Sequence, residues 1–178
     1  VKESKKMIPG DPWDPSSLTG AIVDKTQLDK IHNYVEHGKK EGAKIATGGN
    51  IMLKNTGGYY YEPTVFDNVK NNMKIAREEI FGPVLSSITF KTTEEALKIA
   101  NDTHYGLAAA VWTQDISKAH LIAKGLRAGT VYVNNYDEAD LTVPAGGYKQ
   151  SGIGRDNSYH ALDTYLQTKS TWIKLADK

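Results

Sequence analysis

Residues 107–133, LAAAVWTQDISKAHLIAKGLRAGTVYV, carry the strongest structural signal in the chain. The nearly apolar run at 107–113 is typical of a strand that is covered on both faces. Asp115 can cap the helix that follows, and Gly129 is placed to provide the left-handed conformation that commonly ends a helix. Residues 130–133 then form the next strand. This strand–helix–strand order predicts a right-handed crossover between parallel strands.

The same alternation extends toward the N-terminus. Val84–Phe90 has the composition of a strand, and Thr92 with Glu95 resembles a capping box at the start of another helix. Repeated units of this kind are typical of an α/β fold. We therefore predict a mainly parallel sheet with flanking helices.

The first half of the chain adds one long helix and two short strands. Asp24 begins an amphipathic pattern that ends near Gly42. Residues 44–47 and 61–66 have strand-like composition. Pro63 indicates edge positions, because proline cannot donate a ladder hydrogen bond.

The two ends of the chain differ from this central unit. Residues 1–20 are rich in proline and glycine and are predicted to form an arm or loop. Residues 21–166 form the main domain, which closes with a helix at about 157–165. Residues 167–178 form a tail with a strand at Ser170–Lys174. This strand has no partner nearby in the sequence, so it must pair with the body of the protein or with another chain.

Composition argues against several functions. The 178 residues hold 22 Lys plus Arg against 21 Asp plus Glu, so neither nucleic acid nor an anionic membrane is an expected partner. No apolar run approaches the roughly 18 residues that span a bilayer. The absence of cysteine excludes disulfides and thiolate zinc sites, and it fits a reducing, cytoplasmic compartment. No two of the five histidines lie four residues apart, so no metal site is expected.

A glycine-rich loop at 144–154 is the first candidate site. Its Gly152-Ile153-Gly154 lacks the third glycine and the βαβ context of a dinucleotide fingerprint, and Ser151 lacks the flanking glycines of a hydrolase elbow. Gly146, Gly147 and Gly152 are interpreted as positive-φ turns that let the backbone pass close to another group.

The acidic pair Glu78 and Glu79 is the second candidate. Adjacent side chains of an extended chain point in opposite directions, so one carboxylate can face solvent or Arg77 while the other enters a cleft. Phe81 then shares the side of Glu79, and an acid beside an aromatic ring can bind a ribose. On spacing alone, a solvated turn is the alternative.

Four motifs resemble those of the NAD(P)-dependent aldehyde dehydrogenase superfamily, in the same order and with familiar gaps. They are EEIFGPV at 78–84, N-x-x-x-YGLAA at 101–109, AGTVYVN at 128–134 and GGYKQSG at 146–152. The resemblance implies the α/β fold of that family's catalytic domain. It also implies that the C-terminal strand extends a sheet of a neighbouring subunit, which makes a homo-dimer or tetramer the expected assembly.

The resemblance also assigns cofactor and substrate residues. Glu79 would bind the nicotinamide ribose hydroxyls of NAD or NADP, Phe81 would pack on that ribose and the nicotinamide, and Leu107 would line the nicotinamide end of the site. Four further residues would line the aldehyde tunnel: Asn134, Tyr136, Asp137 and Ala145.

Ala145 departs from the family pattern, in which this position is usually aromatic. Loss of the ring widens the tunnel, so either a bulkier or more polar aldehyde or a neighbouring side chain is expected to fill the space. Within the superfamily, the chain most resembles the γ-glutamyl-γ-aminobutyraldehyde dehydrogenases of putrescine breakdown. Betaine aldehyde and broad aliphatic enzymes are neighbours of that group.

Enzymes of this family oxidise an aldehyde to a carboxylate through a cysteine thiohemiacetal. The family's nucleophilic cysteine lies upstream of the segment that Val1 matches, and none of its catalytic motifs is in this chain. The sequence is therefore interpreted as the C-terminal part of a longer subunit, without catalytic residues and inactive alone. The alternative is a stand-alone, non-catalytic binding or assembly module with the family fold.

Overall fold

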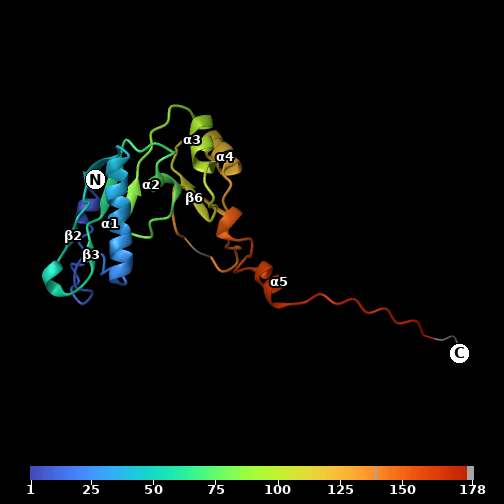
Figure 1. Ribbon diagram of the computed structural model, residues 1–178. Helices are drawn as coiled ribbons and strands as arrows, with labels where there is room; N and C mark the ends of the chain where they lie inside the picture. The colour runs from blue at the N-terminus through green and yellow to red at the C-terminus, as the bar shows by residue number, and fades with distance from the viewer. Residues whose placement is uncertain (139, 176–178) are drawn as a thin grey trace. The chain divides into compact units, whose positions relative to one another are not determined.

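The computed structural model describes residues 1–138 and 140–175 (Figure 1). The chain divides into two compact units, Val1–Lys91 and Thr92–Lys178, called here the first and the second unit. Each contains helices together with a parallel pair of strands, which confirms the predicted α/β class.

The first unit is built on a three-stranded sheet in the order β1-β4-β5. Strand β4 (Thr64–Asp67) pairs in parallel with β5 (Val84–Ser86) and antiparallel with β1 (Lys44–Thr47). A separate antiparallel hairpin joins β2 (Ile51–Met52) to β3 (Tyr60–Tyr61).

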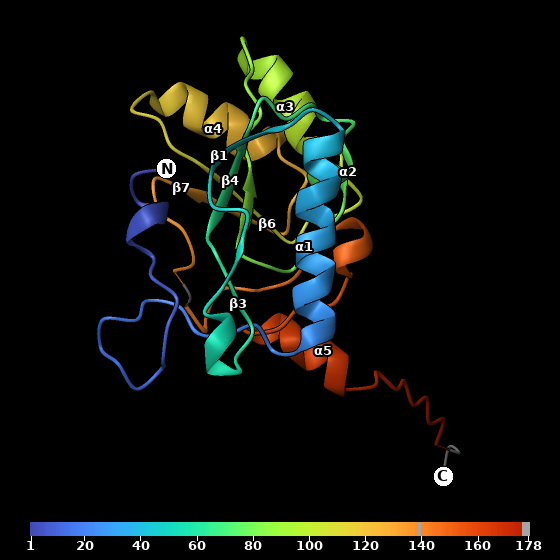
Figure 2. The same cartoon turned by 60° about the vertical axis from the view of Figure 1, so that its left-hand side comes forward.

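Helix α1 (Lys25–Lys40) lies along this sheet (Figure 2). It begins where the sequence predicts, because the Asp24 carboxylate accepts a hydrogen bond of 2.7 Å from the Gln27 backbone N–H. Its apolar face joins residues of the strands and of α2 (Lys74–Arg77) in one buried cluster. The cluster consists of Leu28, Ile31, Val35, Ala43, Tyr61, Phe66, Val69, Met73, Ile75 and Ile80.

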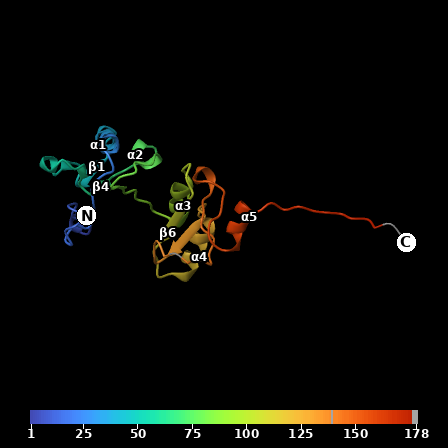
Figure 3. The same ribbon diagram turned by 90° about the horizontal axis from the view of Figure 1, so that it is seen from below.

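The second unit contains the predicted strand–helix–strand crossover (Figure 3). Strand β6 (Ala108–Val111) pairs in parallel with β7 (Thr130–Val133), and α4 (Ile116–Gly125) packs on both of them. Helix α3 (Thr93–Asn101) packs against α4. Backbone N–H groups donate to the caps Thr92 and Asp115 at 3.2 and 3.1 Å, as the sequence predicts.

The remaining helical segments are short. The predicted helix at 157–165 is instead a 3-10 turn at Tyr159–Ala161 followed by α5 (Leu162–Tyr165). Three further 3-10 turns lie at Ser4–Lys6, Lys54–Thr56 and Lys149–Ser151.

Two strand predictions differ from the structure. Residues 64–67 form the central strand of their sheet and not an edge, because Pro63 precedes the ladder and so withholds no hydrogen bond from it. The strand at β6 is exposed or only partly buried, although its nearly apolar sequence predicted cover on both faces. Helix α4 packs on this pair, and β6 has only β7 as a sheet neighbour among the described strands.

The role predicted for Gly129 is wrong. Helix α4 ends at Gly125, and Gly129 is not among the residues with positive φ. A Cβ at Gly129 would overlap the carbonyl oxygen of Gly146 and lie 2.7 Å from its carbonyl carbon. The glycine is needed for close approach of two backbone segments, as are Gly146 and Gly147, whereas Gly152 alone of that loop's glycines has positive φ.

The tail from Lys169 to Leu175 forms no ladder with any other described residue, and the Trp172 side chain is 95% exposed. The strand predicted at Ser170–Lys174 therefore stays a prediction about pairing with another chain, and residues 176–178 of the predicted tail lie outside the described residues. Among the described helices, none has the length and apolar character needed to cross a membrane.

Candidate functional site

The turn between α2 and β5, residues 78–82, sends its two carboxylates to different environments. The Tyr34 hydroxyl donates a 2.6 Å hydrogen bond to Glu78 Oε2, and Lys74 Nζ lies 3.7 Å from the same oxygen. Glu79 is exposed, and its side chain has no hydrogen bond or ion pair to any other described residue. Glu79 is thus the carboxylate of the pair that is available to a ligand.

Phe81 presents an aromatic ring beside this free carboxylate. Its side chain is 73% exposed, and its backbone has a φ of 55°, in the left-handed region that non-glycine residues seldom adopt. The neighbouring Ile80 is buried in the core, so the turn is anchored on one side and open on the other.

Glu79 and Phe81 line the same open depression, which has a volume of about 310 Å³. A free carboxylate accepts hydrogen bonds from neighbouring hydroxyl groups, and an exposed ring can cover a sugar or a heterocycle. The acceptor carboxylate, the exposed ring and the open surface fit the ribose predicted for this turn. The other residues of the depression are Ile75, Glu78, Ile80, Gly82, Val84, Leu85 and Ser86.

Gln27 of α1 also holds the turn, although the sequence predicted only a local role for it at the start of the helix. The Gln27 side-chain amide donates to the Ile80 carbonyl at 3.1 Å and to the Phe81 carbonyl at 2.8 Å. The spacing Asp24–Gln27 identified Gln27 as a member of a helix cap. No signal within the helix indicated that its side chain reaches a turn more than fifty residues away.

The other predicted site residues lie in the second unit. Leu107 directly precedes β6 and is 58% exposed. Asn134 follows β7 with a φ of 59°, and its side-chain amide accepts from the Thr113 N–H at 2.8 Å and donates to the Thr113 carbonyl at 3.0 Å. In this unit the polar atoms of Asn134 therefore join two loops at the end of the β6–β7 pair.

Tyr136 and Asp137 follow in the same loop, and both are exposed. The Tyr136 ring lies 5.4 Å from the ring of Tyr132, measured between centroids. Ala145 lies in the glycine-rich loop, where its backbone exchanges hydrogen bonds of 2.8 and 2.7 Å with Asp156. The structure thus brings the four predicted tunnel residues onto loops that follow β7.

Two cations that sequence reasoning did not single out hold the glycine-rich loop. Lys149 Nζ donates to the carbonyl oxygens of Asn101 and Thr103 at 2.9 and 3.2 Å. The Arg155 guanidinium donates to the Gly147 carbonyl at 2.9 Å. Ala145 is therefore carried by a loop whose backbone is fixed from both sides.

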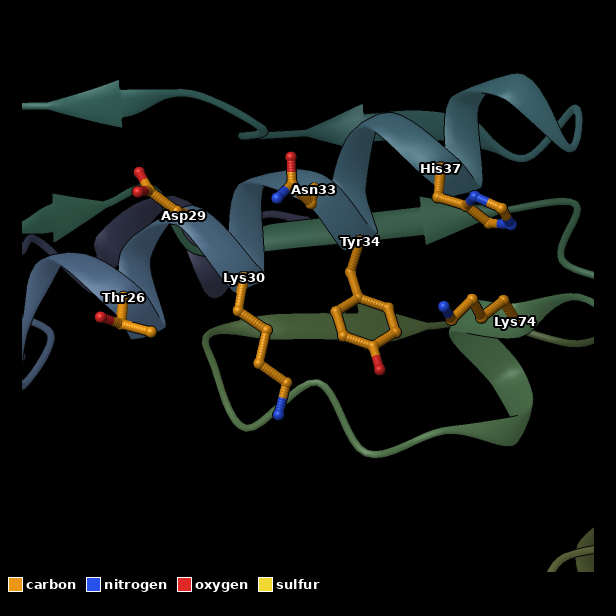
Figure 4. Close-up of a pocket in the computed structure, with 7 residues that line it drawn as sticks. All are labelled: Thr26, Asp29, Lys30, Asn33, Tyr34, His37 and Lys74. Carbon is orange, nitrogen blue, oxygen red and sulfur yellow. The ribbon is translucent and has the colours of Figure 1, made fainter.

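A larger hollow of about 540 Å³ is lined by residues of α1 and by Lys74 of α2 (Figure 4). Lys30 and Lys74 place their Nζ atoms 6.0 and 5.2 Å from the centre of the Tyr34 ring, so the hollow is basic on one side. Its lining is completed by Thr26, Asp29, Asn33 and His37. Across the part of the chain that the structure describes, no group of three or more His, Asp or Glu residues is arranged to hold a metal ion.

Comparison with known proteins shows which family has this architecture. The model of the aldehyde dehydrogenase family matches residues 1–171. The NADP/NAD-dependent aldehyde dehydrogenase PuuC of Escherichia coli K12 is 45% identical over 174 residues, which are 98% of this chain and 34% of PuuC. The chain therefore spans about a third of the length of the curated relatives it matches.

Two solved structures have the same fold over nearly the whole chain. The aldehyde dehydrogenase KauB from Pseudomonas aeruginosa is 60% identical with a TM-score of 0.93, over 96% of this chain and 34% of KauB. A mutant of the P. syringae indole-3-acetaldehyde dehydrogenase AldA in complex with NAD+ and IAA is 58% identical, with the same TM-score and coverage. The matches show that the chain has the α/β fold of these structures. It belongs to the aldehyde dehydrogenase family.

Proposed function

We propose that this chain supplies the nicotinamide-ribose contacts and part of the aldehyde tunnel of an NAD(P)-dependent aldehyde dehydrogenase subunit. The observation that carries the proposal is the free carboxylate of Glu79 beside the exposed ring of Phe81 on one turn. Glu79 accepts hydrogen bonds from the ribose hydroxyls, and Phe81 packs on the ribose and the nicotinamide. The family resemblance alone assigns Leu107, in the second unit, to the nicotinamide end. The cofactor, when bound, accepts a hydride from the substrate.

The chemical step requires groups that this chain does not contain. The chain has no cysteine, so the nucleophile that forms the thiohemiacetal belongs to the preceding part of the subunit. The exposed apolar side chains of the second unit support this division. Ala119 is its one fully buried hydrophobic residue within the described part of the chain. Apolar surface of this extent is covered when the rest of the subunit is present.

An amino- or γ-glutamylamino-aldehyde is the proposed substrate class. PuuC is 45% identical across nearly the whole chain, and the tunnel residues assigned by the family resemblance include the polar side chains of Asn134, Tyr136 and Asp137. Ala145 leaves the tunnel wide enough for a long or polar aldehyde. The exposed Trp172 and Ile173 support a further element of the proposal, in which Ser170–Lys174 pairs with a neighbouring subunit of a homo-oligomer.

Purified residues 1–178 are expected to show no NAD(P)-dependent aldehyde oxidation, because the nucleophile is absent. The full-length subunit is expected to oxidise γ-glutamyl-γ-aminobutyraldehyde with a higher kcat/KM than betaine aldehyde or indole-3-acetaldehyde. NADH and NADPH production at 340 nm measures both. Turnover by residues 1–178 would contradict the assignment of the nucleophile to another part of the subunit. A preference for indole-3-acetaldehyde would contradict only the substrate class.

Replacement of Glu79 by glutamine in the full-length subunit is expected to raise the KM for the cofactor about tenfold or more, because a charged acceptor of ribose hydroxyls is lost. Glu78→Gln is the matched control, since Glu78 is bound to Tyr34 and Lys74 and is expected to change the cofactor KM by less than about threefold. Initial rates at varied cofactor concentration measure both variants. Equal cofactor kinetics in wild type and Glu79→Gln would remove Glu79 from the site.

A further inference from the structure

Three residues of one face of α1 contact the turn that carries Glu79 and Phe81. Gln27, Ile31 and Tyr34 are spaced four and three residues apart, so they lie in a row along the helix. Gln27 donates to two carbonyls of the turn, and Tyr34 donates to Glu78 at its beginning. Between them, Ile31 packs so closely that a Cβ on Gly82 would lie 2.5 Å from its side chain.

This row contacts the turn at Phe81, whose left-handed backbone is the unfavourable conformation of the turn. A left-handed φ at a residue with a large side chain costs free energy, and such a conformation persists only when its surroundings impose it. The Phe81 ring is largely exposed, so burial of the ring does not offset the cost. The Gln27 amide, in contrast, donates to the carbonyl of Phe81 itself and to the carbonyl just before it.

The cap of α1 leaves this amide available. At many helix starts the third residue of the first turn returns its side chain to the cap residue. Here the Asp24 carboxylate is bound by the backbone N–H of Gln27, and the Gln27 side chain points to the turn. The start of the helix and the conformation of the turn are thus coupled through a single residue.

We propose that Gln27 is a positioning residue for the cofactor site, which holds Phe81 in its left-handed conformation and thereby sets the direction of the Phe81 ring and the Glu79 carboxylate. Gln27 acts through the backbone of the turn. This inference rests on the proposed function, in which the turn binds the ribose of the cofactor.

The proposal is tested with two substitutions in the full-length subunit. Gln27→Met keeps the length and the helix propensity of the side chain but removes the donor. Gln27→Glu places a carboxylate against two carbonyl oxygens and so reverses the interaction. We expect the cofactor KM to rise about fivefold for Gln27→Met and further for Gln27→Glu, with the aldehyde KM nearly unchanged. Asn33→Ala, at an exposed position of the same helix, is the control and is expected to match wild type.

A double-mutant cycle separates positioning from general stability. In a Phe81→Ala background only the Glu79 carboxylate remains to be positioned, so Gln27→Met is expected to raise the cofactor KM by a smaller factor than it does in wild type. Full additivity of the two substitutions, or equal KM values for wild type and both Gln27 variants, would overturn the proposal. If Glu79→Gln also has no effect, the proposed function itself fails. If Glu79→Gln weakens cofactor binding and the Gln27 variants do not, only the positioning role is lost.

Discussion

Replacement of Gly129 by alanine is expected to destabilise the second unit by about 3 kcal/mol or more, because the new methyl group has no space. A Cβ at this position would overlap the Gly146 carbonyl oxygen and lie 3.1 Å from the Gly147 Cα atom. Both neighbours are backbone atoms, so they cannot move aside by a change of rotamer. The two segments must separate, and the loop that carries Ala145 shifts with them.

The hydrogen bonds around Gly129 increase this cost. The Gly106 carbonyl accepts from the N–H groups of Gly129 and Tyr148 at 2.9 and 2.8 Å, so separation of the segments breaks contacts on both sides. Thermal unfolding and aldehyde kinetics of the full-length variant measure the effect. Gly154→Ala is the matched control in the same loop, since a Cβ there meets no atom within 4 Å. Equal stability of the two variants would show that the close approach is not required.

Phe66→Ala is expected to destabilise the first unit by about 3–5 kcal/mol, the range typical of a large aromatic side chain removed from a core. Phe66 lies on the central strand β4, and its side chain is 0% exposed. Its ring is within reach of a Cβ on Gly38, so it fills the space between the sheet and the end of α1. A cavity at this point loosens the contact that keeps α1 over the sheet.

Urea unfolding of residues 1–178, followed by far-UV circular dichroism, measures this loss. Phe66→Leu is the graded control, because it retains part of the apolar volume and is expected to cost less than half as much as alanine. A Phe66→Ala midpoint equal to that of wild type would mean that α1 is held by other contacts. Since α1 also carries Gln27, the same substitution in the full-length subunit is expected to raise the cofactor KM.

The candidate site was predictable where its signal is local. Glu79 and Phe81 lie two residues apart, so the sequence already brings them onto one turn, although Phe81 is left-handed and not extended as the predicted alternation assumed. That Glu78 is the paired carboxylate was not predictable, because its partner Tyr34 comes from a helix far away in the sequence. The same limit applies to Lys149, which donates to the carbonyl of the last residue of α3 and to that of Thr103 just after it.

The wrong prediction for Gly129 has the same origin. A glycine that follows a helical pattern is most simply explained by a left-handed helix end, and nothing within a few residues of Gly129 argues against this. Position 129 requires glycine because the Gly146 carbonyl lies against it, and this contact exists only in the folded chain. The wrong edge-strand prediction at 61–66 differs, because the predicted strand began at residue 61 whereas β4 begins at Thr64, directly after Pro63.

The sequence by itself determined where α1, α3 and α4 begin, that β6 and β7 form a parallel pair, and to which family the chain belongs. These properties depend on caps, apolar periodicity and motifs, which act within a few residues of one another. Only the tertiary structure decided that Glu79 is free, that Gln27 reaches the Phe81 turn, and that Gly129 faces a backbone carbonyl. Each of these is a contact between distant segments, and packing of the folded chain alone sets such distances.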